Sequence, residues 1–121
     1  MKASEEDLAW IDPGSDPVSA ARGLLPQPCT LALVTLGGDG ALAVNEESTV
    51  EVSSPQVDVV DTIGAGDAFM GAFLAHWRER GLGREELRRL HEVEQAVAFA
   101  CRVAALTCGR AGADPLRLDE L

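Results

Sequence analysis

The sequence is poor in cysteine and in positive charge, and each of these two shortages argues against certain classes of protein. Three cysteines without a C-x-x-C pair support neither a disulfide framework nor a zinc site, and fit a reducing compartment. Ten Lys and Arg against 20 Asp and Glu give a net charge of -10, which argues against nucleic acid and membrane surfaces as partners. No apolar run reaches membrane-spanning length, and the first residues lack a signal-peptide core. We therefore expect a cytoplasmic protein.

The sequence does contain the alternation of elements that is typical of one α/β domain. Asp16 and Pro17 form a helix start, with a capping side chain followed by a first-turn proline. The apolar run 31–36 predicts a strand buried on both faces of a mainly parallel sheet. Two shorter strands are predicted at 41–44 and 49–52, and a further one at 57–60.

Helical periodicity dominates the second half of the chain. Phe69, Phe73 and Trp77 recur at helical spacing, which predicts a helix that begins within residues 64–67 and ends near Gly81. A short surface helix is predicted at 84–91. Residues 93–106 are apolar on almost every side, which predicts a helix buried within a larger body.

The segment Gly64-Ala65-Gly66-Asp67 connects a predicted strand to this helix. Unpaired amides and the positive end of a helix dipole meet at such a junction, and glycines let a phosphate approach the backbone, so an anion site is expected. The absence of Gly-Lys-Ser/Thr excludes a Walker A loop, and Phe69 in place of a third glycine excludes the Rossmann pattern. Two interpretations remain open. Asp67 either caps its helix beside a tight turn, or meets an attacking hydroxyl group next to a bound phosphate.

Residues 61–69, D-T-I-G-A-G-D-A-F, followed by Gly71 and Phe73, resemble the D-T-x-G-A-G-D-x-F signature of ribokinase (PfkB) family carbohydrate kinases. Residues 34–41 are similar to the T-L-G-x-x-G nucleotide-binding turn of the family, a pattern that alone usually marks only a strand and hairpin. Residues 104–113 resemble the family's loop beside the adenine. The resemblance implies a ribokinase-like three-layer α/β/α fold. Residues 1–121 would be its C-terminal nucleotide-binding and catalytic part, without the N-terminal sugar-binding part.

The resemblance also implies roles for individual residues in ATP-dependent phosphorylation of a sugar hydroxyl group. Asp67 would be the general base, and the amides of Gly64, Ala65 and Gly66 would form the anion hole. Further residues that would contact ATP are Thr35, Gly37, Gly40, Thr107 and Gly112. The sequence motifs near both ends of the chain are most similar to those of bacterial fructokinases, which favours a fructose-type sugar.

Metal ions follow from the same resemblance. The family uses Mg²⁺ on the phosphates and K⁺ near the anion hole. Asp61 and the backbone carbonyl of Ile63 occupy the positions that match the monovalent cation site, although Asp61 could simply cap the turn. Asp7 is the nearest match to the N-x-x-E motif that orients Mg²⁺, and a solvated helix start explains this acidic stretch equally well.

A chain that represents only part of a sheet needs a partner. The missing N-terminal part would leave a strand edge and the helix at 93–106 uncovered, which predicts a homodimer or association with that part. Two alternatives to a kinase stay open. One is a nucleotide-binding module without kinase activity, and the other is a truncated remnant whose glycine turn binds only adventitious anions.

Overall fold

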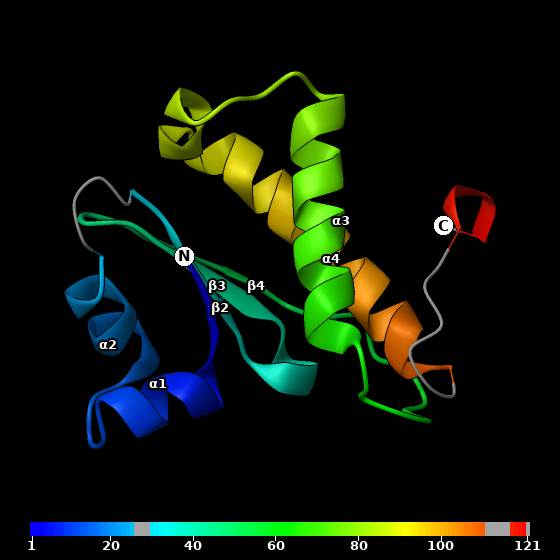
Figure 1. Cartoon of the computed structure of the whole chain (residues 1–121), viewed down its shortest axis with the longest axis horizontal. Helices are drawn as coiled ribbons and strands as arrows, with labels where there is room; N and C mark the ends of the chain where they lie inside the picture. Colours follow the sequence, from blue (N-terminus) through cyan, green and yellow to red (C-terminus); the bar gives the residue numbers. More distant parts are fainter. Residues whose placement is uncertain (26–29, 111–116, 121) are drawn as a thin grey trace.

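In the computed structural model, residues 1–25, 30–110 and 117–120 are described, and they form a sheet that lies between two pairs of helices (Figure 1). The strands, in their order across the sheet, are β1 (Lys2–Ser4), β2 (Ala32–Thr35), β3 (Ala41–Val44) and β4 (Thr49–Val52). The helices are α1 (Glu5–Ile11), α2 (Pro17–Gly23), α3 (Ala65–Glu79) and α4 (Leu90–Cys108). Short 3₁₀ turns occur at η1 (Gly37–Asp39), η2 (Glu85–Arg88) and η3 (Leu118–Glu120).

Strand pairing differs from the mainly parallel sheet that the sequence predicts. Across the described sheet, β1 pairs with β2 in parallel, whereas β2 with β3 and β3 with β4 are antiparallel. The short turns that follow β2 and β3 cannot hold a crossover, so they return the chain as hairpins. The strand predicted at 57–60 is also wrong, because this extended segment joins no sheet and instead donates the Val60 and Asp61 amides to the Cys108 carbonyl, at 2.8 and 3.0 Å.

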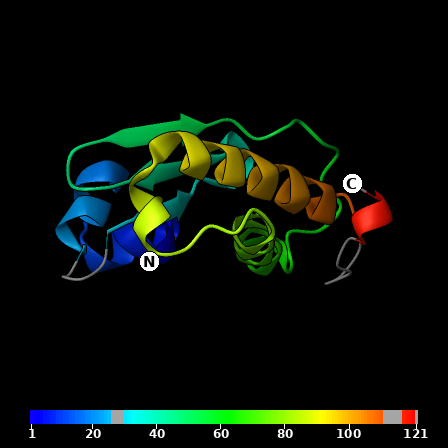
Figure 2. The same cartoon turned by 90° about the horizontal axis from the view of Figure 1, so that it is seen from above.

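The two faces of the sheet carry separate cores, which gives the three layers that were expected. Ala32 and Val34 of β2 pack against α1 and α2, while Leu33 of the same strand packs against α3 and α4. This alternation follows from the two-residue period of a strand. Figure 2 shows α3 end-on beside α4, on one side of the strands. An α/β fold is therefore confirmed, and the buried apolar side chains on both faces explain the apolar run in β2.

The predicted helix boundaries are largely confirmed, except that the surface helix predicted at 84–91 is the 3₁₀ turn η2 followed by the start of α4. The Asp16 carboxylate accepts a hydrogen bond from the Ser19 amide at 3.0 Å, and Pro17 is the first residue of α2. Helix α3 ends at its cap Arg80, just before Gly81. Helix α4 is longer than predicted and exposes polar residues up to Arg102, whereas the residues from Val103 to Cys108 are buried or half-buried. Among the described helices, none is both long enough and apolar enough to cross a membrane.

Acidification should weaken the cap of α2. The amide and hydroxyl groups of Ser19, which bond to the Asp16 carboxylate, hold the pKa of Asp16 below its usual 3.8. A carboxyl group whose pKa is lowered by folding stabilises the folded state above its unfolded pKa, and this stabilisation disappears as the pH falls through the folded pKa. We expect wild-type unfolding midpoints to fall as the pH drops below 3.8, and Asp16→Asn, which keeps an acceptor oxygen, to depend less on pH.

The measurement is thermal unfolding followed by circular dichroism from pH 6 down to about pH 3. Asp58→Asn is the matched control, because it removes an exposed carboxylate that caps no helix. Equal pH dependence of the Asp16→Asn and Asp58→Asn variants would show that the α2 cap does not contribute.

Candidate active site

A cleft of about 440 Å³ opens at the carboxyl ends of β1 and β2. These two strands are parallel and place Ser4 opposite Thr35 at the same edge of the sheet, where open α/β sheets bind their ligands. Both glycine-containing segments reach this cleft, the first through Gly37, Gly38 and Gly40 and the second through Ala65 and Gly66. The other walls come from residues 54–57, from Val59 and from the last turns of α4.

The first segment is the turn between β2 and β3. The Leu36 amide donates to the Gly40 carbonyl at 2.8 Å and closes the turn. Gly40 has a φ of 114°, and a Cβ at this position would lie 1.9 Å from the Val52 carbonyl oxygen of β4. Only glycine fits a backbone that combines positive φ with this approach. The glycine therefore holds the turn against β4 and fixes the position of its cleft-lining residues.

The second segment is the start of α3. Gly64 is the N-cap and has a φ of 80°, a conformation that glycine adopts without strain. The Ala65 amide donates to the Thr62 carbonyl at 3.2 Å, and the Ala68 amide donates to the Gly64 carbonyl at 2.8 Å. Within the described residues, the amides of Gly66 and Asp67 have no acceptor. Free first-turn amides and the positive end of the α3 dipole together favour an anion at this point.

The predicted catalytic residues therefore lie close together, although they do not all line the cleft. Ala65 and Gly66 line it, Gly64 precedes them as the N-cap, and Asp67 follows as an exposed residue of the first turn. No hydrogen bond or ion pair ties the Asp67 carboxylate to another described residue, so it is free to contact a ligand.

The predicted nucleotide contacts divide in the same way. Thr35, Gly37 and Gly40 line the cleft. Thr107 is buried and donates its hydroxyl to the Val103 carbonyl at 2.8 Å, within α4, although its neighbour Cys108 lines the cleft. Gly112 lies outside the described residues, and its role stays a prediction.

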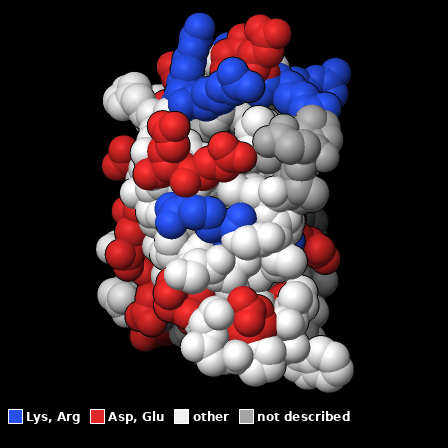
Figure 3. Space-filling view, turned by 90° about the vertical axis from the view of Figure 1, so that its left-hand side faces the viewer, with Lys and Arg blue, Asp and Glu red and all other residues white. Residues whose placement is uncertain are grey.

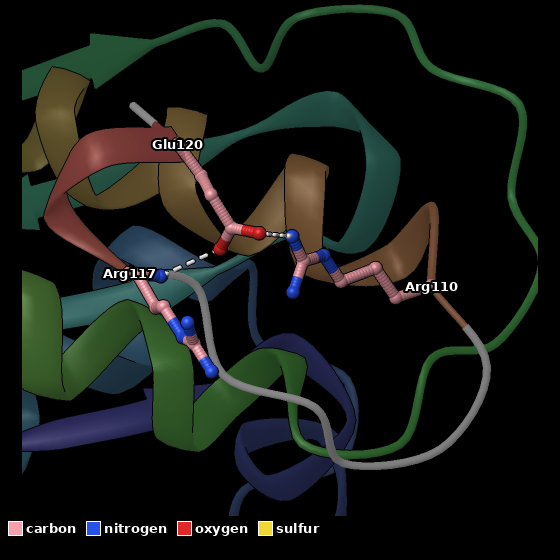
Figure 4. A network of polar contacts seen from close by, with 3 residues as sticks. All are labelled: Arg110, Arg117 and Glu120. Atoms are coloured by element: carbon pink, nitrogen blue, oxygen red, sulfur yellow. Dashed lines mark hydrogen bonds and ion pairs between the residues drawn. The ribbon is translucent and has the colours of Figure 1, made fainter.

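The end of the described chain is held close to the end of α4 (Figure 4). The Arg110 guanidinium forms an ion pair with Glu120 at 2.5 Å, and the Arg117 amide donates to the same carboxylate at 2.7 Å. The amide of Arg117, and to a lesser extent the side chain of Arg110, holds the pKa of Glu120 below its usual value. These two interactions of Glu120 keep η3 beside the end of α4 that carries Cys108.

The predicted metal ligands are less close to the cleft. Asp7 is exposed and closes a capping box, since its carboxylate accepts from the Ser4 amide and its own amide donates to the Ser4 hydroxyl, each at 3.0 Å. These bonds hold the pKa of Asp7 below its usual value. Asp61 accepts from the Ile63 amide at 2.9 Å, which shapes the turn before α3. No three His, Cys, Asp or Glu side chains within the described ranges form a cluster that could hold a metal ion.

Sequence reasoning missed Lys2 and Cys101, which line the cleft from β1 and from α4. Glu5 and Glu6, at the start of α1, also line it, although the sequence singled out their neighbour Asp7 as the metal ligand. Burial raises the pKa of the Cys101 thiol to about 11, so this thiol is a neutral wall at physiological pH. The available signal was the polar pair Lys2 and Ser4 on either side of an apolar residue, a two-residue alternation typical of a strand.

Comparison with known proteins agrees with this geometry. The chain matches the description "pfkB family carbohydrate kinase" over residues 1–119. It is 40% identical over 80 residues to a 1-phosphofructokinase of Haloferax volcanii, which covers 66% of this chain and 26% of that protein.

Solved structures give the same result. A fructokinase of Vibrio cholerae O395, determined with fructose, ADP and calcium ion, matches with a TM-score of 0.78 and 30% identity, over 93% of this chain and 35% of that one. An aminoimidazole riboside kinase of Salmonella enterica, determined with aminoimidazole riboside and an ATP analogue, matches with a TM-score of 0.78 and 31% identity, over 93% and 36%. The chain thus spans about a third or less of the length of these proteins. Its sequence match, its fold and its glycine-lined cleft show that the chain belongs to the pfkB family of carbohydrate kinases.

Proposed function

We propose that the protein transfers the γ-phosphoryl group of ATP to a sugar hydroxyl group, and that this chain forms the nucleotide cleft and the catalytic edge of the enzyme. The main support is that one cleft is lined by both glycine-containing segments, at the edge where β1 and β2 end. The turn at 37–40 would contact the nucleotide, while the first turn of α3 would hold the phosphates. The family and the ligands of the two similar kinases are consistent with this arrangement.

In this mechanism the backbone at the start of α3 binds the phosphoryl group, and the Asp67 side chain acts as the base. The free Gly66 amide and the α3 dipole would hold the transferring phosphoryl group, and the Asp67 carboxylate would accept the proton of the attacking hydroxyl group. The transition state of phosphoryl transfer is largely dissociative, so positioning and charge neutralisation carry most of the catalysis, and the proton can leave late. An exposed, unpaired carboxylate directly after an anion-binding turn meets these needs.

The ions of the family fit this edge to different degrees. Mg²⁺ binds one or two carboxylates together with phosphate oxygens, and would neutralise phosphate charge here. Glu5 and Glu6 line the cleft and offer such oxygens directly, whereas the Asp7 carboxylate is engaged in its capping box. Asp61 and the Ile63 carbonyl stay proposed ligands of K⁺, in the turn that leads into α3.

The sugar site would lie mainly outside this chain, because the chain spans about a third of similar kinases. An apolar groove of about 370 Å³ is available for the part that carries it, or for a second copy of the chain. This groove lies on the α3 face of the sheet and includes Met1, Leu33, Phe73 and Trp77. Fructose is the first sugar to test, since the fructokinase of Vibrio cholerae O395 was determined with it.

Two assays test the proposal. Calorimetry with ATP tests for nucleotide binding by the chain. Coupled ADP release with fructose, ribose and nucleosides, measured on the chain alone and on the chain combined with an N-terminal part, tests for the kinase. Binding without turnover in either preparation would favour the nucleotide-binding module, and no binding at all would favour the remnant.

A pair of glycine variants makes the binding assay specific. In Gly66→Ala the added methyl group would enter the cleft at 3.1 Å from Lys2 Nζ, and we expect ATP affinity to fall about tenfold, about 1.4 kcal/mol. Gly71→Ala is the matched control, because the added methyl group on the same helix meets nothing within 4 Å. Equal losses in both variants would argue against phosphate binding at the start of α3.

A further inference from the structure

Lys2 brings a positive charge into the cleft. It is the only lysine of the chain and lies on β1, half-buried, with its side chain on the α3 face of the sheet. A Cβ built on Gly66 would lie 3.1 Å from Lys2 Nζ, which places the ammonium group against the first turn of α3. The strand pairing holds Lys2 there, because β1 lies parallel to β2 with Lys2 opposite Leu33.

This ammonium group acts at a distance on the Asp7 carboxylate, whose pKa it helps to lower, but it has no direct polar partner among the described residues. Within the described residues it forms no hydrogen bond or ion pair, although Glu5 and Glu6 line the same cleft. It also lies beside the positive end of the α3 dipole, and two positive groups at one point repel each other. An anion bound between the ammonium and the free Gly66 amide would turn this repulsion into attraction, and a charge-assisted hydrogen bond would add to it.

The rest of the surface does not supply this charge. Lys2 is the only Lys or Arg among the residues that line the cleft. Figure 3 shows basic side chains gathered mainly at the upper end of one face, and acidic side chains in several separate patches below them. The 3₁₀ turn η2 lies at that end in Figure 1. It carries three arginines, Arg84, Arg88 and Arg89, in the turn or next to it, and none of them lines the cleft. In a chain of net charge -10, a polyphosphate needs a local cation.

We infer that Lys2 binds the β- and γ-phosphates of the nucleotide, in the cleft between β1 and the first turn of α3. This inference rests on the proposed function for the identity of the ligand. Lys2 is a binding residue in it and takes no proton from the sugar. The position explains why a single lysine is placed on an edge strand only three residues long.

Calorimetry on the chain separates this inference from the proposed function. Lys2→Met keeps the length and apolar stem of the side chain but removes the charge, and we expect it to bind ATP and ADP about tenfold more weakly and adenosine equally well. Lys2→Arg should retain most of the affinity. Arg102→Met removes an exposed cation of α4 that does not line the cleft, and should leave all affinities unchanged. If the wild type binds ATP and Lys2→Met binds it equally, the inference is wrong while the proposed function stands. Failure of the wild type to bind ATP overturns both.

A second measurement does not depend on how the variant folds. Reductive methylation with ¹³C-formaldehyde labels one side chain in this chain, because Lys2 is the only lysine, and the terminal amine gives a separate signal. ATP should shift the dimethyl-lysine signal, whereas adenosine should not. Saturation with ATP without a shift of that signal, or an equal shift with adenosine, would refute contact between Lys2 and the phosphates.

Discussion

Replacement of Asp67 by asparagine should slow sugar phosphorylation by about 10²–10⁴-fold and change ATP affinity by less than about threefold. Asparagine has the size of aspartate but cannot accept the proton of the attacking hydroxyl group. Since the carboxylate is exposed and forms no hydrogen bond or ion pair with other described residues, its loss should not disturb α3. The amides of Gly66 and residue 67 remain in place to hold the phosphates.

The experiment measures ADP release under saturating ATP, in whichever preparation phosphorylates sugar, and ATP affinity by calorimetry. Asp39→Asn is the matched control, because Asp39 is an exposed carboxylate in η1 that does not line the cleft. Unchanged turnover in Asp67→Asn would show that the base has been misassigned. A parallel loss of turnover in Asp39→Asn would point to general charge effects instead.

The second large effect should be on stability. In Gly40→Ala the new methyl group would lie 1.9 Å from the Val52 carbonyl oxygen, and the residue would also have to keep a φ of 114°. The clash between the methyl group and the Val52 carbonyl oxygen can be relieved only by moving β4 away from the turn, since the carbonyl belongs to the backbone. We expect the free energy of unfolding to fall by about 3–5 kcal/mol.

Gly14→Ala distinguishes the two causes. Gly14 also has positive φ, at 91°, but its added methyl group would meet nothing within 4 Å. We expect a loss of about 1–2 kcal/mol there, from backbone strain alone. Urea unfolding followed by circular dichroism measures both variants. Similar losses at the two positions would mean that the contact with Val52 relaxes easily and that the turn is not held against β4.

Local signals in the sequence predicted much of the fold. Asp16 and Pro17 specify the start of α2, and the spacing of Phe69, Phe73 and Trp77 specifies α3, because capping and helical periodicity act over a few residues. The glycine segment 64–67 predicts a candidate anion site at the start of α3. These features depend on neighbouring residues, which a sequence displays directly.

Features that depend on distant residues were not predictable. Valines at 57–60 favour a strand, but no strand lies beside them and the segment bonds to the end of α4 instead. The polar-apolar-polar order of Lys2, Ala3 and Ser4 is compatible with a strand, but it does not indicate that Lys2 would lie beside Gly66. The hairpin geometry of β2, β3 and β4 likewise depends on turn length rather than on the apolar pattern.

The walls of the cleft come from opposite ends of the chain, with Lys2 in its first strand and Cys108 at the end of its last long helix. During synthesis, therefore, a ligand of the cleft cannot assist folding of the early hairpins, because the cleft does not exist until α4 has left the ribosome and packed. Once complete, the same site connects all layers, so ATP that binds only the folded state should slow global opening as well as local motion. Nucleotide-dependent protection of β1 amides from hydrogen exchange would be the visible sign of that connection.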